Sequence, residues 1–295
     1  MTISILRTAD GWWVHTAAGA ARIASTADTT SALLANRAAI EDAAQSIDTV
    51  SVDNLTLLSP VTLPCRVVAQ ATNYISHITD VGRDPAKAQL TFFRKASGAI
   101  VGPFGDIIKP RHVQLLDYEV EIGLVIGRSL PVGTEVTAAN LSEFVCGLVV
   151  ANDVSARDIQ RAQGQFYEAK SYPSFAPIGP ALVLLDADEL KRFDELRLQL
   201  WVNGEQRQNG VVNGDMLYPP VEALQALSRF QRLDVGDLLL TGTPAGTAMR
   251  APRPNGSSQT QNPYYLHDGD LVEATVATDD GLINLGTQRN VVRYA

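Results

Sequence analysis

Short strand-forming segments, separated by turn residues, fill most of the chain after residue 62. Each is rich in β-branched and aliphatic residues and is bounded by Gly, Pro, Asn or Asp. Helical patterns in this part of the chain are confined to residues 155–164 and 219–230. Because strands and helices do not alternate regularly, the pattern argues against a doubly wound parallel sheet and predicts a strand-dominated α+β fold. The predicted strands are residues 65–71, 118–126, 144–151, 181–185, 196–202, 238–241 and 271–276.

The first 62 residues have a different pattern. Residues 4–7 and 12–15 are typical of short strands around the turn at Asp10-Gly11, and apolar residues recur at helical spacing between residues 29 and 47. A proline-containing segment, residues 59–64, then marks a boundary. We therefore expect a small N-terminal α/β subdomain over residues 1–62 and a larger domain over residues 63–295. Two polar segments, residues 80–89 and 249–264, are expected to be loops, and the first is a candidate lid.

The composition excludes several classes of protein. The chain has 295 residues, 45% of them hydrophobic, so a sizeable core is expected. Its 32 acidic and 24 basic side chains give a net charge of −8, which argues against a nucleic-acid partner or an anionic membrane surface. No apolar run approaches about 18 residues, the length that a membrane-spanning helix needs. The two cysteines, Cys65 and Cys146, lie in apolar runs and cannot form a disulfide framework, so a reducing cytoplasm is the expected location.

Two glutamates share one face of the predicted strand at residues 118–126. Because side chains alternate at a period of two, Glu119 and Glu121 point to the same side, while the apolar residues between and after them point to the other. Asp153 follows a second apolar strand and precedes a helical pattern, so it is expected at a strand end. Three carboxylates brought together there would suit Mg²⁺, Mn²⁺ or Ca²⁺, which prefer oxygen ligands. The same pair of glutamates is also typical of a solvated outer face of an antiparallel sheet.

Several segments together resemble the fumarylacetoacetate hydrolase family. The resemblance covers about residues 63–295. It implies a mixed β-roll packed with helices, usually in a homodimer, and the first 62 residues resemble the N-terminal subdomain of the longer members. The matching motifs are Asn73-Tyr74 with His77, Phe92-Phe93 with Lys95, Asp117-Tyr118-Glu119-Val120-Glu121, Asn152-Asp153-Val154-Ser155-Ala156-Arg157-Asp158, Lys170-Ser171, Pro177-Ile178-Gly179-Pro180, Val202-Asn203-Gly204-Glu205 and Thr241-Gly242-Thr243-Pro244-Ala245-Gly246.

The resemblance also implies roles for individual residues. Glu119, Glu121 and Asp153 resemble the ligands of a single Mg²⁺ or Mn²⁺, a site that Ca²⁺ could fill in crystals. His77 resembles the histidine that activates water, and Asp80 follows it where many members have a glutamate. Because aspartate is one methylene shorter, the pairing of these two side chains is in question, and hydrolysis with it. The remaining candidates are Lys170 beside the metal and, for substrate binding, Tyr74, Lys95, Gln208 and Thr243.

These residue types favour metal-assisted chemistry on a small 2-oxo or diketo acid. A divalent ion can chelate two substrate oxygens and stabilise an enolate, while a histidine that titrates near neutrality can deprotonate water. The first expectation is a metal-dependent hydrolase that cleaves a C–C bond in an acylpyruvate or β-diketo acid, as in aromatic catabolism. A 2-oxo diacid decarboxylase or a 2-hydroxy-dienoate isomerase could use the same site, and a non-catalytic binding member of the family is a further alternative. Arg157 and Asp158 are expected to form a structural ion pair near the metal strand.

Overall fold

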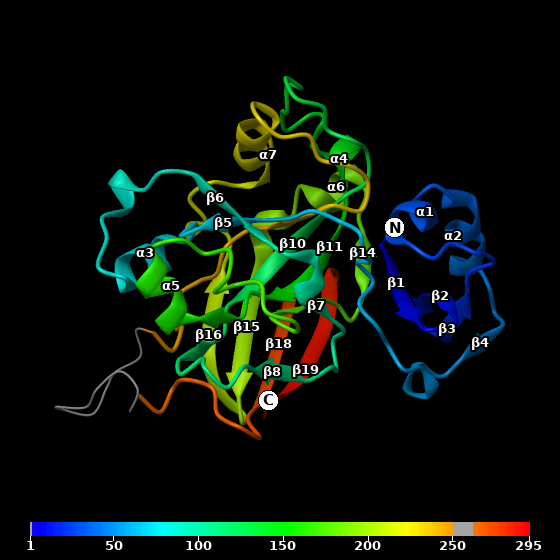
Figure 1. The fold of residues 1–295 in the computed structure, drawn as a ribbon. Helices are drawn as coiled ribbons and strands as arrows, with labels where there is room; N and C mark the ends of the chain where they lie inside the picture. The colour runs from blue at the N-terminus through cyan, green and yellow to red at the C-terminus, as the bar shows by residue number, and fades with distance from the viewer. Residues whose placement is uncertain (1, 250–261) are drawn as a thin grey trace.

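The computed structural model describes residues 2–249 and 262–295. Within these residues the largest element is a mixed ten-stranded sheet, in which most neighbours are antiparallel and β5 runs parallel to β17 (Figure 1). The order of its strands is β4 (Thr49–Val50), β3 (Gly19–Arg22), β2 (Gly11–Thr16), β1 (Ile3–Thr8), β14 (Leu182–Leu184), β11 (Val145–Asn152), β10 (Val120–Ile126), β17 (Leu238–Leu240), β5 (Val67–Ala71) and β6 (Thr91–Lys95).

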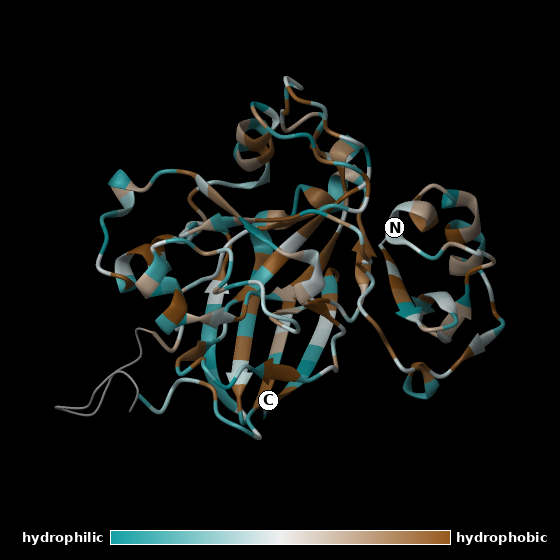
Figure 2. Ribbon diagram, viewed as in Figure 1, coloured by the Kyte–Doolittle hydropathy of each residue, from teal (hydrophilic) through white to brown (hydrophobic). Residues whose placement is uncertain are grey.

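A second sheet packs against β10 and β11 of the first. Two of its strands, β15 and β18, bury every second residue, as expected when one face lies on a core. Figure 2 shows hydrophobic residues along the central strands, where the two sheets meet. The order of the second sheet is β16 (Glu205–Val211), β15 (Leu196–Val202), β18 (Leu271–Thr278), β19 (Asn284–Tyr294) and β8 (Ile107–Lys109). Short pairs join β9 (Leu116–Asp117) to β12 (Ser155–Ala156) and β7 (Ile100–Val101) to β13 (Ala176–Pro177).

The helices are short and lie around the sheets (Figure 1). Among the residues that the structure describes, every helix falls short of the length and hydropathy that crossing a bilayer would require. The α-helices are α1 (Thr30–Leu34), α2 (Arg37–Ala44), α3 (Ile75–Asp80), α4 (Leu141–Phe144), α5 (Arg157–Gln163), α6 (Ala187–Leu190) and α7 (Pro220–Ser228). The 3₁₀-helices are η1 (Val52–Asn54), η2 (Pro85–Lys87), η3 (Ser97–Ala99) and η4 (Phe193–Glu195).

The strand-dominated fold predicted from the sequence is confirmed. Each predicted strand after residue 62 is present near its expected bounds, and the two predicted helices correspond to α5 and α7. The polar segment at residues 80–89 contains η2 and is part of the described structure. The polar loop expected over residues 249–264 lies largely outside the described residues.

The N-terminal strands lie to one side of the molecule but continue the large sheet (Figure 1). Strand β1 pairs with β14, with Ile3 opposite Leu184 and Ile5 opposite Leu182. Thr30 at the start of α1 is tied to the segment before β5, because its N–H donates to Thr62 Oγ1 at 2.7 Å. One sheet therefore runs through both predicted parts of the chain, and a boundary at residues 62 and 63 stays a prediction.

Candidate active site

The antiparallel pairing of β10 and β11 brings the three predicted metal ligands together. Val120 lies opposite Asn152, so Glu119 and Asp153 meet just beyond this pair, where the Asp153 N–H donates to the Glu119 carbonyl oxygen at 2.8 Å. Every residue of β10 is buried, since β11 and β17 cover its edges and the second sheet contacts it. A shift of one residue in the register would turn Glu121 to the opposite face, so the strand pairing itself builds the site.

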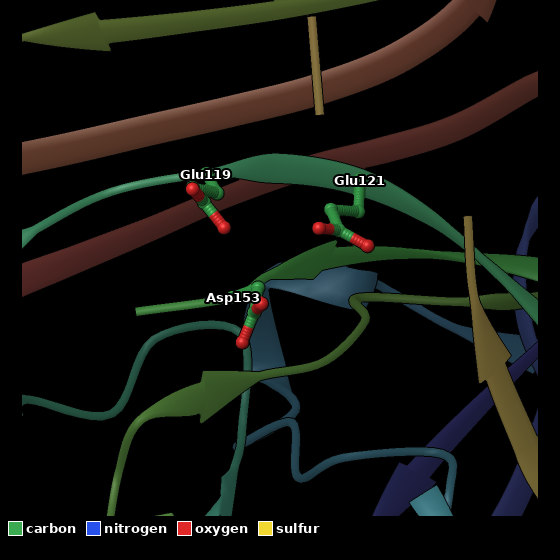
Figure 3. A group of neighbouring side chains, drawn as sticks. All are labelled: Glu119, Glu121 and Asp153. Atoms are coloured by element: carbon green, nitrogen blue, oxygen red, sulfur yellow. The ribbon is translucent and has the colours of Figure 1, made fainter. Parts of the chain in front are cut away.

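Figure 3 shows the side chains of Glu119, Glu121 and Asp153 turned toward a common space. One carboxylate oxygen from each lies within 4.8 Å of the other two. The residues are only 5%, 2% and 1% exposed, so the solvated outer face that the pattern also allowed does not occur here. Hard oxygen ligands of this kind suit Mg²⁺ or Mn²⁺ better than zinc or copper.

Two buried lysines contact these carboxylates. Nζ of Lys170 lies 2.5 Å from Oε2 of Glu119 and 2.5 Å from Oδ2 of Asp153, and Nζ of Lys95 lies 2.5 Å from Oδ1 of Asp153. Burial acts to lower the pKa of both lysines. At Lys170 the negative charges of Asp153 and Glu119 outweigh burial, so its pKa is raised, whereas at Lys95 burial prevails and the pKa is lowered. Lys170 thus lies beside the candidate metal site and lines its cavity. Lys95, expected to bind substrate, contacts the ligand Asp153.

An arginine and a further aspartate complete the buried network. Arg157 donates from Nε to Asp117 Oδ2 at 2.8 Å and also pairs with Glu119. Asp117 accepts from the Ala248 N–H at 2.8 Å as well, which fastens the loop after β17 to the site. The expected ion pair between Arg157 and Asp158 is wrong, because Asp158 instead accepts from backbone N–H groups at Gln114 and Leu115.

Glu121 is the carboxylate in this cluster without a cation, among the residues that the structure describes. It accepts a hydrogen bond from the Gly242 N–H at 2.8 Å. Burial, together with the charges of Asp153 and Glu119, holds the pKa of Glu121 well above its usual value. By contrast, Arg157 and Lys170 overcome the effect of burial on Glu119 and lower its pKa.

The donor set therefore fits one divalent cation. Buried like charges are costly without a compensating positive charge. Three cationic side chains form ion pairs in the cluster of four buried carboxylates described above: Lys95, Lys170 and Arg157. Glu121, the carboxylate left over, has an oxygen within the converging group. Glu119, Glu121 and Asp153 are accordingly the residues that would hold the ion.

His77 lies in the wall of a cavity of about 430 Å³ that is also lined by the three carboxylates. Its side chain comes from α3 and is 6% exposed. Its Nδ1 is buried and has no hydrogen-bond partner in the described part of the chain. Burial, only partly opposed by the charge of Glu119, lowers the pKa of His77, so the neutral imidazole prevails at neutral pH.

Asp80 is not joined to His77 in this structure. It is the last residue of α3 and is exposed. No hydrogen bond links the two side chains within residues 2–249 and 262–295, although the i, i+3 spacing places them on neighbouring parts of the helix. The carboxylate that would orient the histidine in a dyad is thus supplied neither by Asp80 nor by another described residue.

The remaining candidates divide between the cavity and its support. Thr243 lines the cavity, and its hydroxyl donates to the Val120 carbonyl at 2.8 Å. Gln208 is buried behind it, where Nε2 donates to Thr243 Oγ1 at 2.9 Å and Oε1 accepts from the Val120 N–H at 3.0 Å. Tyr74 is fully buried and does not line this cavity. Their roles in substrate binding stay predictions.

The sequence reasoning missed two positively charged residues of the cavity. Arg83 lies just beyond α3 and Arg161 lies on α5; both are exposed and both line the cavity with the carboxylates. A regular charge spacing on α5 could have indicated Arg161, but nothing in the sequence pairs it with Arg83.

Comparison with known proteins agrees with this geometry. A model of the fumarylacetoacetate (FAA) hydrolase C-terminal domain matches residues 66–293. The mitochondrial oxaloacetate tautomerase Fahd2a of Rattus norvegicus is 35% identical over 232 residues, which cover 78% of this chain and 69% of that protein. A fumarylacetoacetate hydrolase from Exiguobacterium antarcticum has a TM-score of 0.76 at 30% identity, with 100% of both chains covered.

The similar proteins do not share one named reaction. The 5-carboxymethyl-2-hydroxymuconate delta-isomerase from Mycobacterium smegmatis also covers 100% of both chains, with a TM-score of 0.72 at 26% identity. These relatives are thus named as a hydrolase, a tautomerase and an isomerase. The family model and the curated relative each match more than three quarters of the chain, so this chain belongs to the fumarylacetoacetate hydrolase family.

Proposed function

We propose that the protein is a divalent-metal-dependent enzyme that moves a proton on a small 2-oxo acid, as a keto–enol tautomerase or a double-bond isomerase. The observation that carries this proposal is His77, which is buried in the cavity wall with an unpartnered Nδ1 and a lowered pKa. Because Nδ1 is buried, Nε2 is the ring nitrogen that a substrate could reach, and a neutral imidazole is a suitable proton acceptor near neutral pH.

Different residues act on the two parts of the substrate's reacting group, its oxygen atoms and the carbon that gains the proton. A divalent ion held by Glu119, Glu121 and Asp153 would supply Lewis-acid polarisation of the substrate's oxo and carboxylate oxygens. Lys170 holds a fixed positive charge at the same end. His77 takes the proton from the enol hydroxyl, and its imidazolium returns a proton to the adjacent carbon. Because this step only moves a proton from oxygen to carbon, it needs no activated water and no redox partner.

Arg83 and Arg161 favour a diacid among the 2-oxo acids. Both line the cavity, and no ion pair of either falls within the described residues. A guanidinium that lacks a protein partner is well suited to bind a carboxylate. A substrate with its 2-oxo acid end at the metal site would present its second carboxylate to these arginines. The name of the rat relative, an oxaloacetate tautomerase, supports the same substrate class.

Hydrolysis of an acylpyruvate or β-diketo acid is the second candidate. The likeness to the Exiguobacterium antarcticum hydrolase supports it, and the candidate metal site would serve it equally well. It requires His77 to deprotonate a water and deliver it to a carbonyl carbon. A histidine in that role is usually oriented by a carboxylate, and no hydrogen bond joins Asp80 to His77 within the described structure.

The test follows three reactions of the Mn²⁺-loaded protein in parallel. These are the loss of enol absorbance from oxaloacetate, the release of CO₂ from oxaloacetate, and the ultraviolet loss of acetylpyruvate. We expect metal-dependent ketonisation that EDTA abolishes and that His77→Gln slows by about 10² or more. Full turnover of the metal-free protein would refute the proposal. Cleavage of acetylpyruvate without ketonisation would replace it with hydrolysis, and release of CO₂ without either would indicate a decarboxylase.

The diacid preference has its own variants. Arg83→Gln and Arg161→Gln are expected to raise KM for oxaloacetate and to leave KM for a 2-oxo monoacid unchanged. Arg94→Gln is the matched control, because Arg94 is an exposed arginine on β6 that does not line the cavity. Equal effects on both substrates would contradict the assignment.

A further inference from the structure

Helix α3, which carries His77, does not cap its own start. The helix has six residues, and its N-cap residue Tyr74 makes no side-chain cap hydrogen bond. A helix this short is marginal by itself, and its first N–H groups need acceptors. The conformation around His77 therefore depends on contacts from elsewhere in the chain.

Asp215, which lies almost 140 residues further along the chain, provides those acceptors. Its backbone carbonyl accepts from the Ile75 N–H at 2.7 Å. Its carboxylate accepts from the Ser76 N–H at 2.6 Å and from the Ser76 hydroxyl at 2.6 Å. The neighbouring residues Tyr74 and Met216 form a β-bridge, so the start of α3 is fastened to the segment around Asp215 at several points.

Ser76 also links α3 to the loop beside the metal ligands. Its Oγ accepts from the Ala245 N–H at 3.2 Å. In the same loop, the Gly242 N–H donates to Glu121 at 2.8 Å. Hydrogen bonds and this loop thus connect Asp215, through Ser76, to the carboxylate cluster that lines the same cavity as His77.

We infer that Asp215 and Ser76 are positioning residues for His77. They fix the backbone of α3, and this replaces the orientation that a carboxylate partner would give to the imidazole ring. This inference rests on the proposed function of His77. The imidazole has no hydrogen bond to Nδ1 that could orient it, so its place is set by packing and by the backbone of α3. Catalytic groups displaced by about 1 Å can lose about 10²-fold in rate, so such a clamp has a kinetic consequence.

The test compares Asp215→Ala, Ser76→Ala and the conservative Asp215→Asn in the full-length, Mn²⁺-loaded protein. We expect kcat for ketonisation to fall by about 10²-fold in Asp215→Ala, with KM and the Mn²⁺ affinity by calorimetry nearly unchanged. Asp215→Asn keeps an acceptor for the Ser76 N–H and should recover part of the loss. Asp186→Ala is the control, because the Asp186 carboxylate caps α6 through two N–H groups outside the site.

A second readout separates positioning from general support. The chain has four histidines, so the ring resonances of His77 can be assigned by comparison with His77→Gln and titrated by NMR in the protein loaded with diamagnetic Mg²⁺. In Asp215→Ala and Ser76→Ala, the pKa of His77 should move back toward its ordinary value as the ring gains solvent, while the other histidines do not change. If Asp215→Ala fails to fold, Ser76→Ala, which removes one hydroxyl, carries the test.

The outcomes for the inference and for the proposed function are distinguishable. If His77→Gln is inactive while Asp215→Ala and Ser76→Ala keep the wild-type kcat and the wild-type His77 resonances, the positioning role is wrong. If His77→Gln keeps full turnover, the proposed function is wrong. In that case the His77 titration still decides whether Asp215 and Ser76 hold the ring in place.

Discussion

Charge in the candidate metal site is not balanced residue by residue. Asp153 contacts two lysines and Glu119 contacts a lysine and an arginine, whereas Glu121 has only a backbone N–H within the described structure. Burial and its acidic neighbours raise the pKa of Glu121, so this side chain retains a proton to higher pH than an ordinary glutamate in the metal-free protein. Metal binding should therefore be coupled to proton release at this residue.

Glu121→Gln should separate metal binding from folding. Glutamine has nearly the shape of a protonated glutamate and can still accept from the Gly242 N–H, so the free energy of unfolding without metal should change by less than about 1 kcal/mol. The Mn²⁺ affinity should fall by more than about tenfold, because a direct ligand is lost. Calorimetry with Mn²⁺ and urea unfolding without it measure the two effects. Glu143→Gln, at an exposed ion pair with Arg128, is the control, and an unchanged Mn²⁺ affinity in Glu121→Gln would count against the site.

His77 should make stability depend on pH. Its folded pKa lies below 6.5 because of burial, whereas in the unfolded chain it takes up a proton as the pH falls through about 6.5. The folded state is therefore destabilised as the pH falls from 6.5 toward the lower folded pKa. His77→Gln should flatten this decline in the free energy of unfolding, measured in urea at a series of pH values. His15→Gln, at an exposed position on β2, should not, and equal slopes in His77→Gln and the wild type would contradict the prediction.

Single residues also show where sequence reasoning succeeds and where it stops. Glu119 and Glu121 could be placed on one face because the strand period fixes it. The pattern placed Asp153 only at a strand end, and its grouping with the two glutamates was implied by the resemblance to the family. Arg157 was assigned to the wrong partner, since adjacent residues at a helix start point in different directions and the sequence does not say which one faces the site. The roles of Asp215 and Arg83 depend on contacts between distant segments, which no local pattern records.

Among the elements, β19 is the longest of several strands that the sequence pattern did not predict, which also include β6, β8 and β16. It runs from Asn284 to Tyr294 and buries two polar residues, Gln288 and Asn290, at 0% and 1% exposure. A buried polar residue breaks the alternation of apolar and polar residues that predicts a strand. The amide N–H groups of both residues are paired. Gln288 Nε2 donates to the carbonyls of Val150 at 2.8 Å and Pro177 at 3.0 Å, and Asn290 Nδ2 donates to the Gly105 carbonyl at 2.7 Å. Gln288 therefore joins β19 to β13 and to β11, the strand that leads to Asp153.

Gln288→Ala should destabilise the protein through this joint between strands. The substitution removes a donor from the Pro177 carbonyl and one of two donors from the Val150 carbonyl, which keeps the Gly179 N–H at 3.1 Å. It also creates a small cavity, so the free energy of unfolding should fall by about 1–3 kcal/mol. Mn²⁺ affinity in the remaining folded protein should change little, since Gln288 contacts no ligand. Urea unfolding measures the loss, and Gln206→Ala, at an exposed position of β16, is the control. A loss no larger than that of the control would show that the joint contributes nothing.

For the molecule as a whole, the continuity of the large sheet is the feature that local patterns did not predict. The sequence pattern separates residues 1–62 from the rest, yet β1 extends the sheet that contains the candidate metal site. Long-range strand pairing of this kind depends on the edge that the rest of the fold presents, here β14. The homodimer and the cytoplasmic location stay predictions, since both concern how this chain meets other molecules.

Removal of residues 1–62 should expose β14 as a free edge. Ile3, Ser4 and Ile5 pair with Leu184, Val183 and Leu182, so the truncated chain would present unpaired backbone groups beside a fully buried apolar strand. Such edges promote association between chains. Light scattering after size exclusion should find a defined oligomer, expected to be a dimer, for the full chain and larger or heterogeneous species for the truncated one. If residues 63–295 alone kept the oligomeric state and the unfolding midpoint of the full chain, the N-terminal strands would be an independent subdomain and not the edge of this sheet.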